Sequence, residues 1–218
     1  GGILSESPLA WNPGRFDQYM YPYYKADKEA GVITADEAQE LIECLWLKLS
    51  EWVWTISANT ADFFAGYNQF QNLTVGGRTR DGKDATNELS YMCLKATEDT
   101  LAHQPGLSVR IHPDTPDDFM AAVTHLVSKG TGFPAIHSDN AGYQMLVNAG
   151  YEPEDARDWS NCGCVVPHFR ETGEWTSAAN LNFAAALEFA TNEGKSCLSD
   201  KKIALDEKDP KTFSTYEE

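Results

Sequence analysis

The stretch Trp159-Ser160-Asn161-Cys162-Gly163-Cys164-Val165-Val166-Pro167-His168 places two thiols and an imidazole within ten residues. Gly163 permits backbone conformations that a Cβ atom forbids, and Pro167 fixes φ and ends regular structure soon after Cys164. The pattern predicts a tip that displays a thiol. If that tip is strand-like, both cysteines point to the same side. A loop with two buried cysteines fits these residues as well, because free cysteine commonly behaves as a small hydrophobe.

Zinc binding is a further interpretation of Cys162, Cys164 and His168. Structural zinc sites usually separate paired ligands by two to four residues and add a second Cys/His pair. Here a single residue separates the two cysteines, and no second pair follows at that spacing. We therefore expect no metal at this tip and keep a zinc-binding α/β module only as a minor alternative.

The composition limits the classes of function. The chain has 218 residues, 42% of them hydrophobic, which is enough for a sizeable core. Thirty-three acidic against 17 basic residues give a net charge of -16, which disfavours binding to nucleic acid. Five scattered cysteines, an odd number, favour reduced thiols over a disulfide framework. No apolar run approaches the roughly 20 residues that cross a bilayer, so we expect a soluble, cytoplasmic protein.

The elements that must position the tip alternate between helices and strands. Residues 1–24 combine prolines with aromatic rings, and we expect an irregular segment packed onto the body. Helical spacing of apolar residues and capping signals predict helices at about 34–56, 86–103, 116–129, 140–149 and 178–191, with another beginning at 152–156. Short apolar runs predict strands before Gly76-Gly77 and at about 107–111 and 133–137. This order predicts an α/β fold with a barrel or an open sheet.

Some local details can also be predicted. Thr34 and Glu37 have the spacing of a capping box, and Asp84 or Thr86 is expected to cap the second helix. Arg110 is expected to form an internal ion pair with Asp139 or Glu88, because a guanidinium binds carboxylates through two hydrogen bonds. His137 and Asp139 follow a predicted strand, where a carboxylate–histidine pair could be catalytic, although ordering of the loop is the preferred interpretation. The tryptophans Trp46, Trp52 and Trp54 are expected in the core.

Six strings of residues resemble one known family in their order and identity. They are Pro13-Gly14-Arg15-Phe16-Asp17-Gln18, Phe70-Gln71-Asn72-Leu73-Thr74-Val75-Gly76-Gly77, Asp81-Gly82-Lys83-Asp84-Ala85-Thr86-Asn87-Glu88-Leu89-Ser90, Gln104-Pro105-Gly106-Leu107-Ser108-Val109-Arg110, Glu154-Asp155-Ala156-Arg157 and Gly163-Cys164-Val165-Val166-Pro167. Together they resemble the central part of the glycyl radical enzymes. That superfamily includes pyruvate formate-lyase, choline trimethylamine-lyase, glycerol dehydratase, benzylsuccinate synthase and the arylacetate decarboxylases.

The resemblance implies a fold and a reaction. Residues 1–218 would be the central portion of the catalytic barrel, which has ten strands in two antiparallel five-stranded halves surrounded by helices. Cys164 would be the thiyl-radical position on a loop inside the barrel. A radical on a glycine near the far C-terminus takes hydrogen from this cysteine, and the thiyl then takes hydrogen from the substrate. Hydrogen-atom transfer does not need the lowered pKa of a nucleophilic thiol.

The resemblance also implies partners. A radical S-adenosylmethionine activating enzyme with an iron–sulfur cluster would install the glycyl radical under anaerobic conditions, and this chain itself would bind no metal. A small-molecule carboxylate is the expected substrate, and a homo-oligomer is the expected assembly. The family's glycyl radical motif is absent from these 218 residues. We therefore expect a fragment, or one piece of a larger protein.

One departure from the family suggests a substrate class. Lyases acting on choline, glycerol and isethionate typically carry Cys-Val-Glu-Pro, whereas this chain has Val166 in the place of that glutamate. Valine cannot accept a proton and makes an apolar wall. This favours decarboxylation of an arylacetate. The alternatives are addition of a radical to fumarate, C–O or C–N bond cleavage of the dehydratase type, and a radical-less module that binds a ligand.

Further site residues follow from the same resemblance. The positions where relatives line the substrate pocket are Phe70, Val166, His168, Trp175, Ser177 and Leu181. Core packing explains Phe70 equally well, and large aromatic residues such as Trp175 are often simply core. A backbone contact explains His168 slightly better than contact with substrate. Cys162 is expected to be structural.

Overall fold

The computed structural model describes residues 12–51, 58, 70–169, 182–199, 201–203 and 214–215. The chain divides into two compact units, Gly1–Trp175 and Thr176–Glu218. The first unit contains α2 (Phe16–Tyr19), α3 (Tyr21–Glu29), α4 (Ala35–Ser50), β1 (Asn72–Gly76), α6 (Glu88–Thr100), β2 (Gly106–Ile111), α7 (Asp117–Ser128), β3 (Ala135–Ser138), α8 (Asp139–Asn148), α9 (Pro153–Arg157), β4 (Trp159–Cys162) and β5 (Val166–Phe169). The second contains α10 (Phe183–Thr191).

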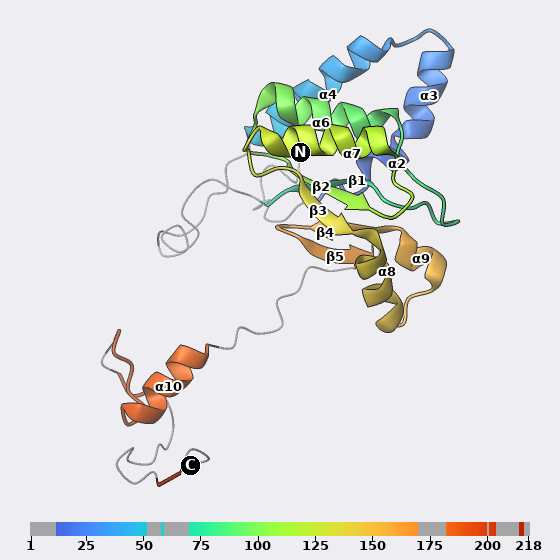
Figure 1. Ribbon diagram of the computed structural model, residues 1–218. Helices are drawn as coiled ribbons and strands as arrows, with labels where there is room; N and C mark the ends of the chain where they lie inside the picture. The colour runs from blue at the N-terminus through green and yellow to red at the C-terminus, as the bar shows by residue number, and fades with distance from the viewer. Residues whose placement is uncertain are drawn as a thin grey trace. The chain divides into compact units, whose positions relative to one another are not determined.

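A parallel sheet with the strand order β1-β2-β3 is the centre of the first unit. Thr74 pairs with Ser108, which in turn pairs with Ala135. The crossover helices α6 and α7 cover one face of this sheet, and α4 packs on α6 (Figure 1). β1 is buried along its whole length, as is usual for strands of a parallel sheet. The predicted α/β alternation is thereby confirmed.

Alternate strand residues serve the two faces of the sheet, because successive side chains point in opposite directions. Leu73, Val75, Leu107 and Val109 belong to the main core with residues of α4, α6 and α7. Trp46 of α4 is fully buried and its Nε1 donates to Thr97 Oγ1 at 2.9 Å, as its predicted place in the core requires. Trp52 and Trp54 lie outside the described residues.

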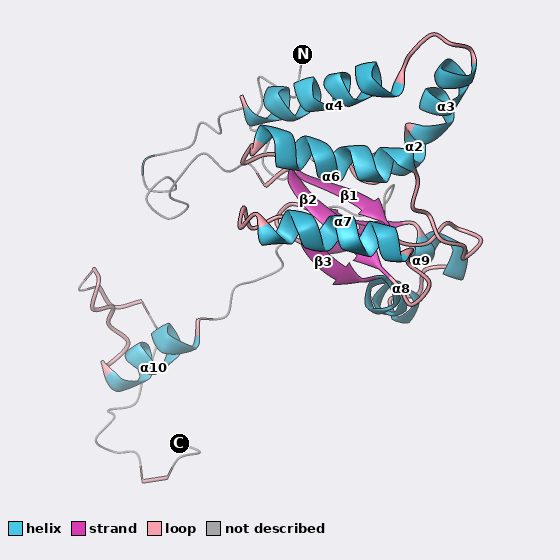
Figure 2. Ribbon diagram, turned by 45° about the horizontal axis from the view of Figure 1, so that its top comes forward, coloured by secondary structure: helices cyan, strands magenta, loops and turns pink. Residues whose placement is uncertain are grey.

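The opposite face of the sheet is polar and carries Asn72, Thr74, Ser108 and Arg110. A hairpin formed by β4 and β5 lies on this side (Figure 1), away from α6 and α7, which cover the other face of the sheet (Figure 2). Its strands pair antiparallel, with Cys162 opposite Val166. Residues 163–165 form the turn. The hairpin is the predicted tip, and a polar sheet face lies beside it.

The predicted barrel has ten strands, which is more than the structure describes. The described strands form a three-stranded parallel sheet and a two-stranded antiparallel sheet. Closure into a barrel therefore stays a prediction. Within the described ranges, no helix is both long and apolar enough to cross a bilayer.

The expectation of an irregular segment at 1–24 is wrong from Phe16 onward, where α2 and α3 form. Pro22 occupies the first turn of α3, where a missing N–H costs no intrahelical hydrogen bond. Residues 1–11 lie outside the described part of the chain.

The expected cap of the second helix is also wrong. Asn87 caps α6 by accepting from the Leu89 amide, while Ser90 Oγ accepts from the Asn87 amide. Asp84 instead accepts from Thr86 and lies 3.0 Å from His112 Nε2.

Other helix ends agree with the sequence. The capping box of Thr34 and Glu37 is present at the start of α4, and Pro116 precedes α7. In the second unit, Asn182 caps α10, and its Oδ1 accepts from the Ala185 amide. Residues 178–181, predicted to begin this helix, lie outside the described part.

Candidate active site at the hairpin tip

The turn of the hairpin gives its two thiols different environments. Cys162 ends β4 and is 7% exposed, whereas Cys164 lies in the turn and is exposed. Gly163 has a φ of 58°, so the chain leaves the extended conformation directly after Cys162. The expectation that both thiols share one side therefore fails, since it assumed a strand-like tip. Burial raises the pKa of the Cys162 thiol.

Two side chains of β1 bind the edge of β4 and the turn. Asn72 Nδ2 donates to the Cys164 carbonyl oxygen at 3.2 Å. The Asn161 amide donates to Thr74 Oγ1 at 3.0 Å. Asn72 and Thr74 lie on the same face of β1, since they are two residues apart in a strand. The tip is thus attached to the N-terminal half of β1.

A buried ion pair holds the start of β4 against the C-terminal end of β2. Arg110 Nε donates to Asp139 Oδ1 at 2.7 Å, and both side chains are almost fully buried. Arg110 also donates to the carbonyl oxygens of Trp159 at 2.5 Å and Arg157 at 2.7 Å. The predicted Arg110–Asp139 pair is confirmed. Burial lowers the pKa of Arg110, and the charge of Asp139 opposes this fall.

A second buried network joins α2 to β1 and to the residue before β4. Arg15 Nη1 donates to Asp158 Oδ1 at 2.8 Å, and its Nη2 donates to the Gly76 carbonyl at 2.9 Å. Asp17 Oδ2 accepts from the Gly76 amide at 2.8 Å and from Ser90 Oγ at 2.6 Å. The N-terminal string therefore supplies charged residues that hold the base of the hairpin.

Phe70 and Val166 are the two predicted pocket residues with described side chains. Phe70 is half-buried, has a φ of 53° and lies two residues before Asn72, at the end of β1 that binds the tip. Val166 begins β5 and is 41% exposed. The structure thus gathers Phe70 and Val166 at the same end of the sheet as Cys164.

The other predicted pocket residues are not placed by their side chains. His168 pairs through its backbone with Ser160, while its side chain lies outside the described part. Trp175, Ser177 and Leu181 also lie outside the described residues.

His137 does not share a hydrogen bond with Asp139, which binds Arg110 instead. The His137 Nε2 atom lies 3.4 Å from Ser108 Oγ, and its ring meets Trp159 edge to face. Burial lowers the pKa of His137. In the described ranges, no three Cys, His, Asp or Glu side chains gather as metal ligands.

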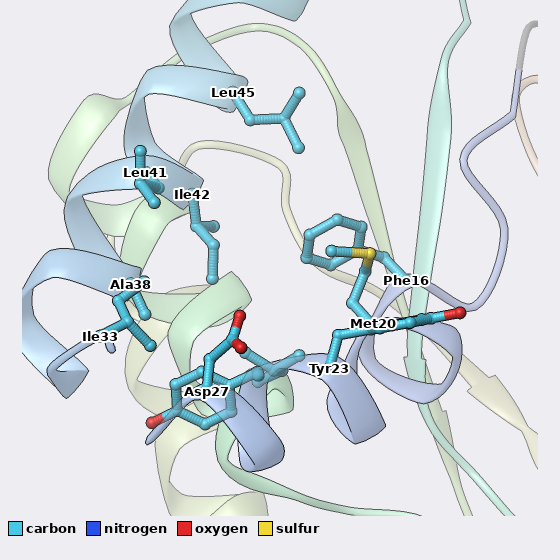
Figure 3. A pocket seen from close by; sticks show the side chains of 11 residues that line it. Phe16, Met20, Tyr23, Asp27, Ile33, Ala38, Leu41, Ile42 and Leu45 are labelled. Carbon is cyan, nitrogen blue, oxygen red and sulfur yellow. The ribbon is translucent and has the colours of Figure 1, made fainter. Parts of the chain in front are cut away.

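An apolar pocket of about 330 Å³ lies elsewhere, between α2, α3 and α4 (Figure 3). Its walls include Phe16, Met20, Ile42 and Leu45. Two of these helices, α3 and α4, lie on the opposite side of the sheet from the hairpin (Figure 1). The pocket is therefore separate from the Cys164 tip.

The family model for pyruvate formate lyase-like proteins matches residues 1–218. The chain belongs to this family of glycyl radical enzymes. It is 37% identical over 208 residues to isethionate sulfite-lyase of Desulfovibrio desulfuricans, covering 94% of this chain and 25% of that protein. It is 35% identical over 220 residues to trans-4-hydroxy-L-proline dehydratase of Clostridioides difficile, covering 100% and 28%.

More distant relatives and solved structures agree with this assignment. The 4-hydroxyphenylacetate decarboxylase glycyl radical subunit of Clostridium scatologenes is 32% identical over 170 residues, covering 75% of this chain and 19% of that protein. The glycerol-bound B12-independent glycerol dehydratase of Clostridium butyricum matches with a TM-score of 0.85 and 39% identity, over 96% of this chain and 26% of that one. This glycyl radical enzyme chain spans about a quarter of the length of the isethionate and glycerol enzymes.

Sequence reasoning missed the attachment of the tip to β1. A signal was present, because Asn72 and Thr74 are polar residues at alternate positions of a buried strand. Buried polar side chains need partners, and those partners must come from another element. The sequence did not reveal which element supplies them.

Proposed function

We propose that this chain is the part of a glycyl radical lyase that carries the thiyl-radical cysteine, Cys164. The exposed thiol in the hairpin turn is the observation that carries the proposal. In the reaction, the glycine radical takes the hydrogen atom of the Cys164 S–H group. The resulting thiyl then takes a hydrogen atom from a substrate carbon and later returns it to the product radical. The protein's task is to hold these atoms close together and to exclude water and oxygen.

The rest of this machinery lies in other parts of the enzyme. The radical glycine belongs to a C-terminal domain outside these 218 residues, and a radical S-adenosylmethionine activating enzyme installs it. Residues 1–218 contribute to a ten-stranded barrel of two antiparallel five-stranded halves, and the enzyme assembles as a homo-oligomer. The parallel β1-β2-β3 sheet is compatible with one part of such a barrel.

Elimination of a substituent from a small hydroxylated substrate is the reaction we favour. The relatives with 35–37% identity are a sulfite-lyase and a dehydratase, whereas the decarboxylase relative has 32% identity and matches a smaller part of the chain. This reverses the preference for an arylacetate, which was drawn mainly from Val166. Because valine cannot accept a proton, the base for an elimination must come from another residue.

Decarboxylation of an arylacetate is the second candidate. Val165 and Val166 are 46% and 41% exposed, so two exposed isopropyl groups directly follow Cys164 in the chain. Such an apolar surface suits an aromatic ring better than a polyol. Addition of a radical to fumarate stays a further alternative, which a requirement for fumarate would reveal.

A substrate panel tests the proposal. The full-length protein is activated anaerobically and assayed with isethionate, trans-4-hydroxyproline, glycerol and 1,2-propanediol, and in parallel with indoleacetate and phenylacetate. We expect turnover of at least one hydroxylated substrate and none of the arylacetates. Turnover of the arylacetates alone would establish the second candidate. Absence of turnover in every assay, despite a full glycyl radical signal, would contradict both candidate reactions for these substrates.

The variant Val166→Glu tests whether the chain lacks a base, because it introduces a glutamate at the position where related lyases carry one. If another residue already supplies the base, the added carboxylate leaves kcat for the hydroxylated substrate unchanged or lowers it. A large rise in kcat would show that no such residue acts in the natural chain.

A further inference from the structure

Asn72 has a fixed position beneath the hairpin tip. It is the first residue of β1, is 3% exposed and pairs with Gly106 of β2. On the other edge of β1, Gly14 forms a bridge with Leu73 and accepts from the Thr74 amide at 2.8 Å. The backbone around Asn72 is thus held from both sides. A hydrogen bond from the Asn72 side chain therefore fixes the tip to a rigid part of the sheet.

Cys164 itself has few attachments. The ladder between β4 and β5 ends at the pair Cys162 and Val166, so the turn has no strand partner. Among the hydrogen bonds of the described residues, the one from Asn72 Nδ2 at 3.2 Å is the only bond that joins Cys164 to another element. It acts on the carbonyl of the same residue that carries the thiol.

Folding stability does not explain an asparagine at this position. The buried Asn72 Oδ1 atom has no hydrogen-bond partner among the described residues. An unpaired buried acceptor loses the hydrogen bonds that water would provide, and this cost offsets what the Nδ2 bond contributes. Leucine has a similar shape and brings no polar side-chain atom that would be buried without a partner. What leucine cannot do is hold the carbonyl of Cys164.

Placement of the thiol controls a hydrogen-atom transfer. The Cys164 sulfur must meet the glycine radical and the substrate carbon in turn, and misplacement by about 1 Å can slow a reaction about 100-fold. We propose that Asn72 is a positioning residue for the Cys164 thiol, acting through its hydrogen bond to the Cys164 carbonyl. This proposal rests on the radical role of Cys164 proposed above.

Asn72→Leu in the full-length, anaerobically activated enzyme tests the proposal. We expect kcat to fall about 10- to 100-fold, with KM changed less than about threefold, because the thiol and not the substrate is displaced. The melting temperature should stay the same or rise, and the yield of glycyl radical should not change. A purely structural role predicts the reverse, a loss of stability with normal kcat in the folded protein.

Asn87→Leu is the matched control. Asn87 Nδ2 also donates to a backbone carbonyl, that of Asp17 at 2.9 Å, but Asn87 caps α6 and its hydrogen bonds among the described residues do not involve Cys164. The same substitution there should lower the melting temperature and leave kcat of the folded protein unchanged. An equal fall of kcat in both variants would contradict a specific role of Asn72.

Asn72→Asp adds a pH-dependent test. An ionised carboxylate cannot donate to the Cys164 carbonyl, whereas the protonated acid can, and burial raises the pKa of such a carboxyl. The kcat of this variant relative to the wild type should therefore rise as the pH is lowered from about 8 to about 6. A ratio that stays constant would contradict the hydrogen-bond mechanism.

The outcomes separate this proposal from the proposed function. Normal kcat in Asn72→Leu, with no turnover by Cys164→Ala, overturns only the positioning role. Turnover by Cys164→Ala overturns the radical role itself. An Asn72→Leu protein that fails to fold also overturns the positioning proposal, because it would show that Asn72 serves stability.

Discussion

Cys162 and Cys164 differ in accessibility although a single residue separates them. Burial raises the pKa of Cys162, so less of it is thiolate at a given pH, and the chain around it restricts access. We expect iodoacetamide at about pH 8 to alkylate Cys164 before Cys162 in the 218-residue chain. Peptide mass spectrometry measures the two rates. Faster or equal modification of Cys162 would contradict the arrangement of the turn.

His137 should make stability depend on pH. Burial lowers its pKa in the folded state, so the unfolded chain binds this proton more readily. The free energy of unfolding should therefore fall as the pH drops from about 6.5 through the lower pKa of the folded protein. His137→Gln should reduce this loss, measured by urea unfolding at about pH 7.5 and 5.5. The same substitution at the exposed His103 should not reduce it.

At the scale of elements, α8 and β4 meet at a glycine that sequence reasoning did not single out. A Cβ atom on Gly142 would lie 2.3 Å from the Trp159 ring. Gly142→Ala should destabilise the protein by about 1–3 kcal/mol through overpacking, although alanine is the better helix former. Thermal or urea unfolding measures the effect. In a Trp159→Phe background the smaller ring should reduce the destabilisation caused by Gly142→Ala. An equal destabilisation in that background would show that the Trp159 ring is not the group with which the added methyl clashes.

The Arg110–Asp139 pair connects β2, α8 and the start of β4. Arg110→Met should destabilise the fold by about 3–5 kcal/mol, because it leaves the Asp139 charge buried without its partner. Adding Asp139→Asn should restore part of this loss. Urea unfolding of the two single variants and the double variant measures the coupling. Additive losses would show that the two charges do not depend on each other.

Local signals predicted many elements because their causes are local. The Thr34–Glu37 capping box and the Gly76-Gly77 turn each act within a few residues. The helix at 21–29 was missed because Pro22 was taken as a breaker, although its position in the first turn permits a helix. The bond from Asn72 to Cys164 spans 92 residues. Hydrophobic periodicity contains no information on such a contact.

At the scale of the whole molecule, the two faces of the parallel sheet have different roles. Leu73, Val75 and Val109 build a helix-covered core on one side. The polar side binds the hairpin at two places. Arg110 binds it near its base, and Asn72 binds it at its tip. A thiol placed in this way can meet reactants while its backbone stays fixed. The likeness to glycerol dehydratase has a TM-score of 0.85 and covers 26% of that chain, so in that protein a similar fold is part of a longer polypeptide.

The sequence and its resemblance to the family named a candidate site around Cys164, whose radical role stays a prediction. The Cys-Gly-Cys string and its neighbours singled out Cys164, and the structure places this thiol in an exposed turn. Val166 pointed toward arylacetates, but a substrate depends on residues scattered over the whole pocket. One substitution could not outweigh the similarity of the remaining chain to lyases of another type.

The central claim is that Cys164, and not Cys162, passes the radical to the substrate. The direct measurement compares Cys164→Ser and Cys162→Ser in the full-length enzyme, recording the glycyl radical by electron paramagnetic resonance and product formation in the same anaerobic sample. We predict a full radical signal with no product for Cys164→Ser, and a full signal with product for Cys162→Ser. Product formation by Cys164→Ser would contradict the account.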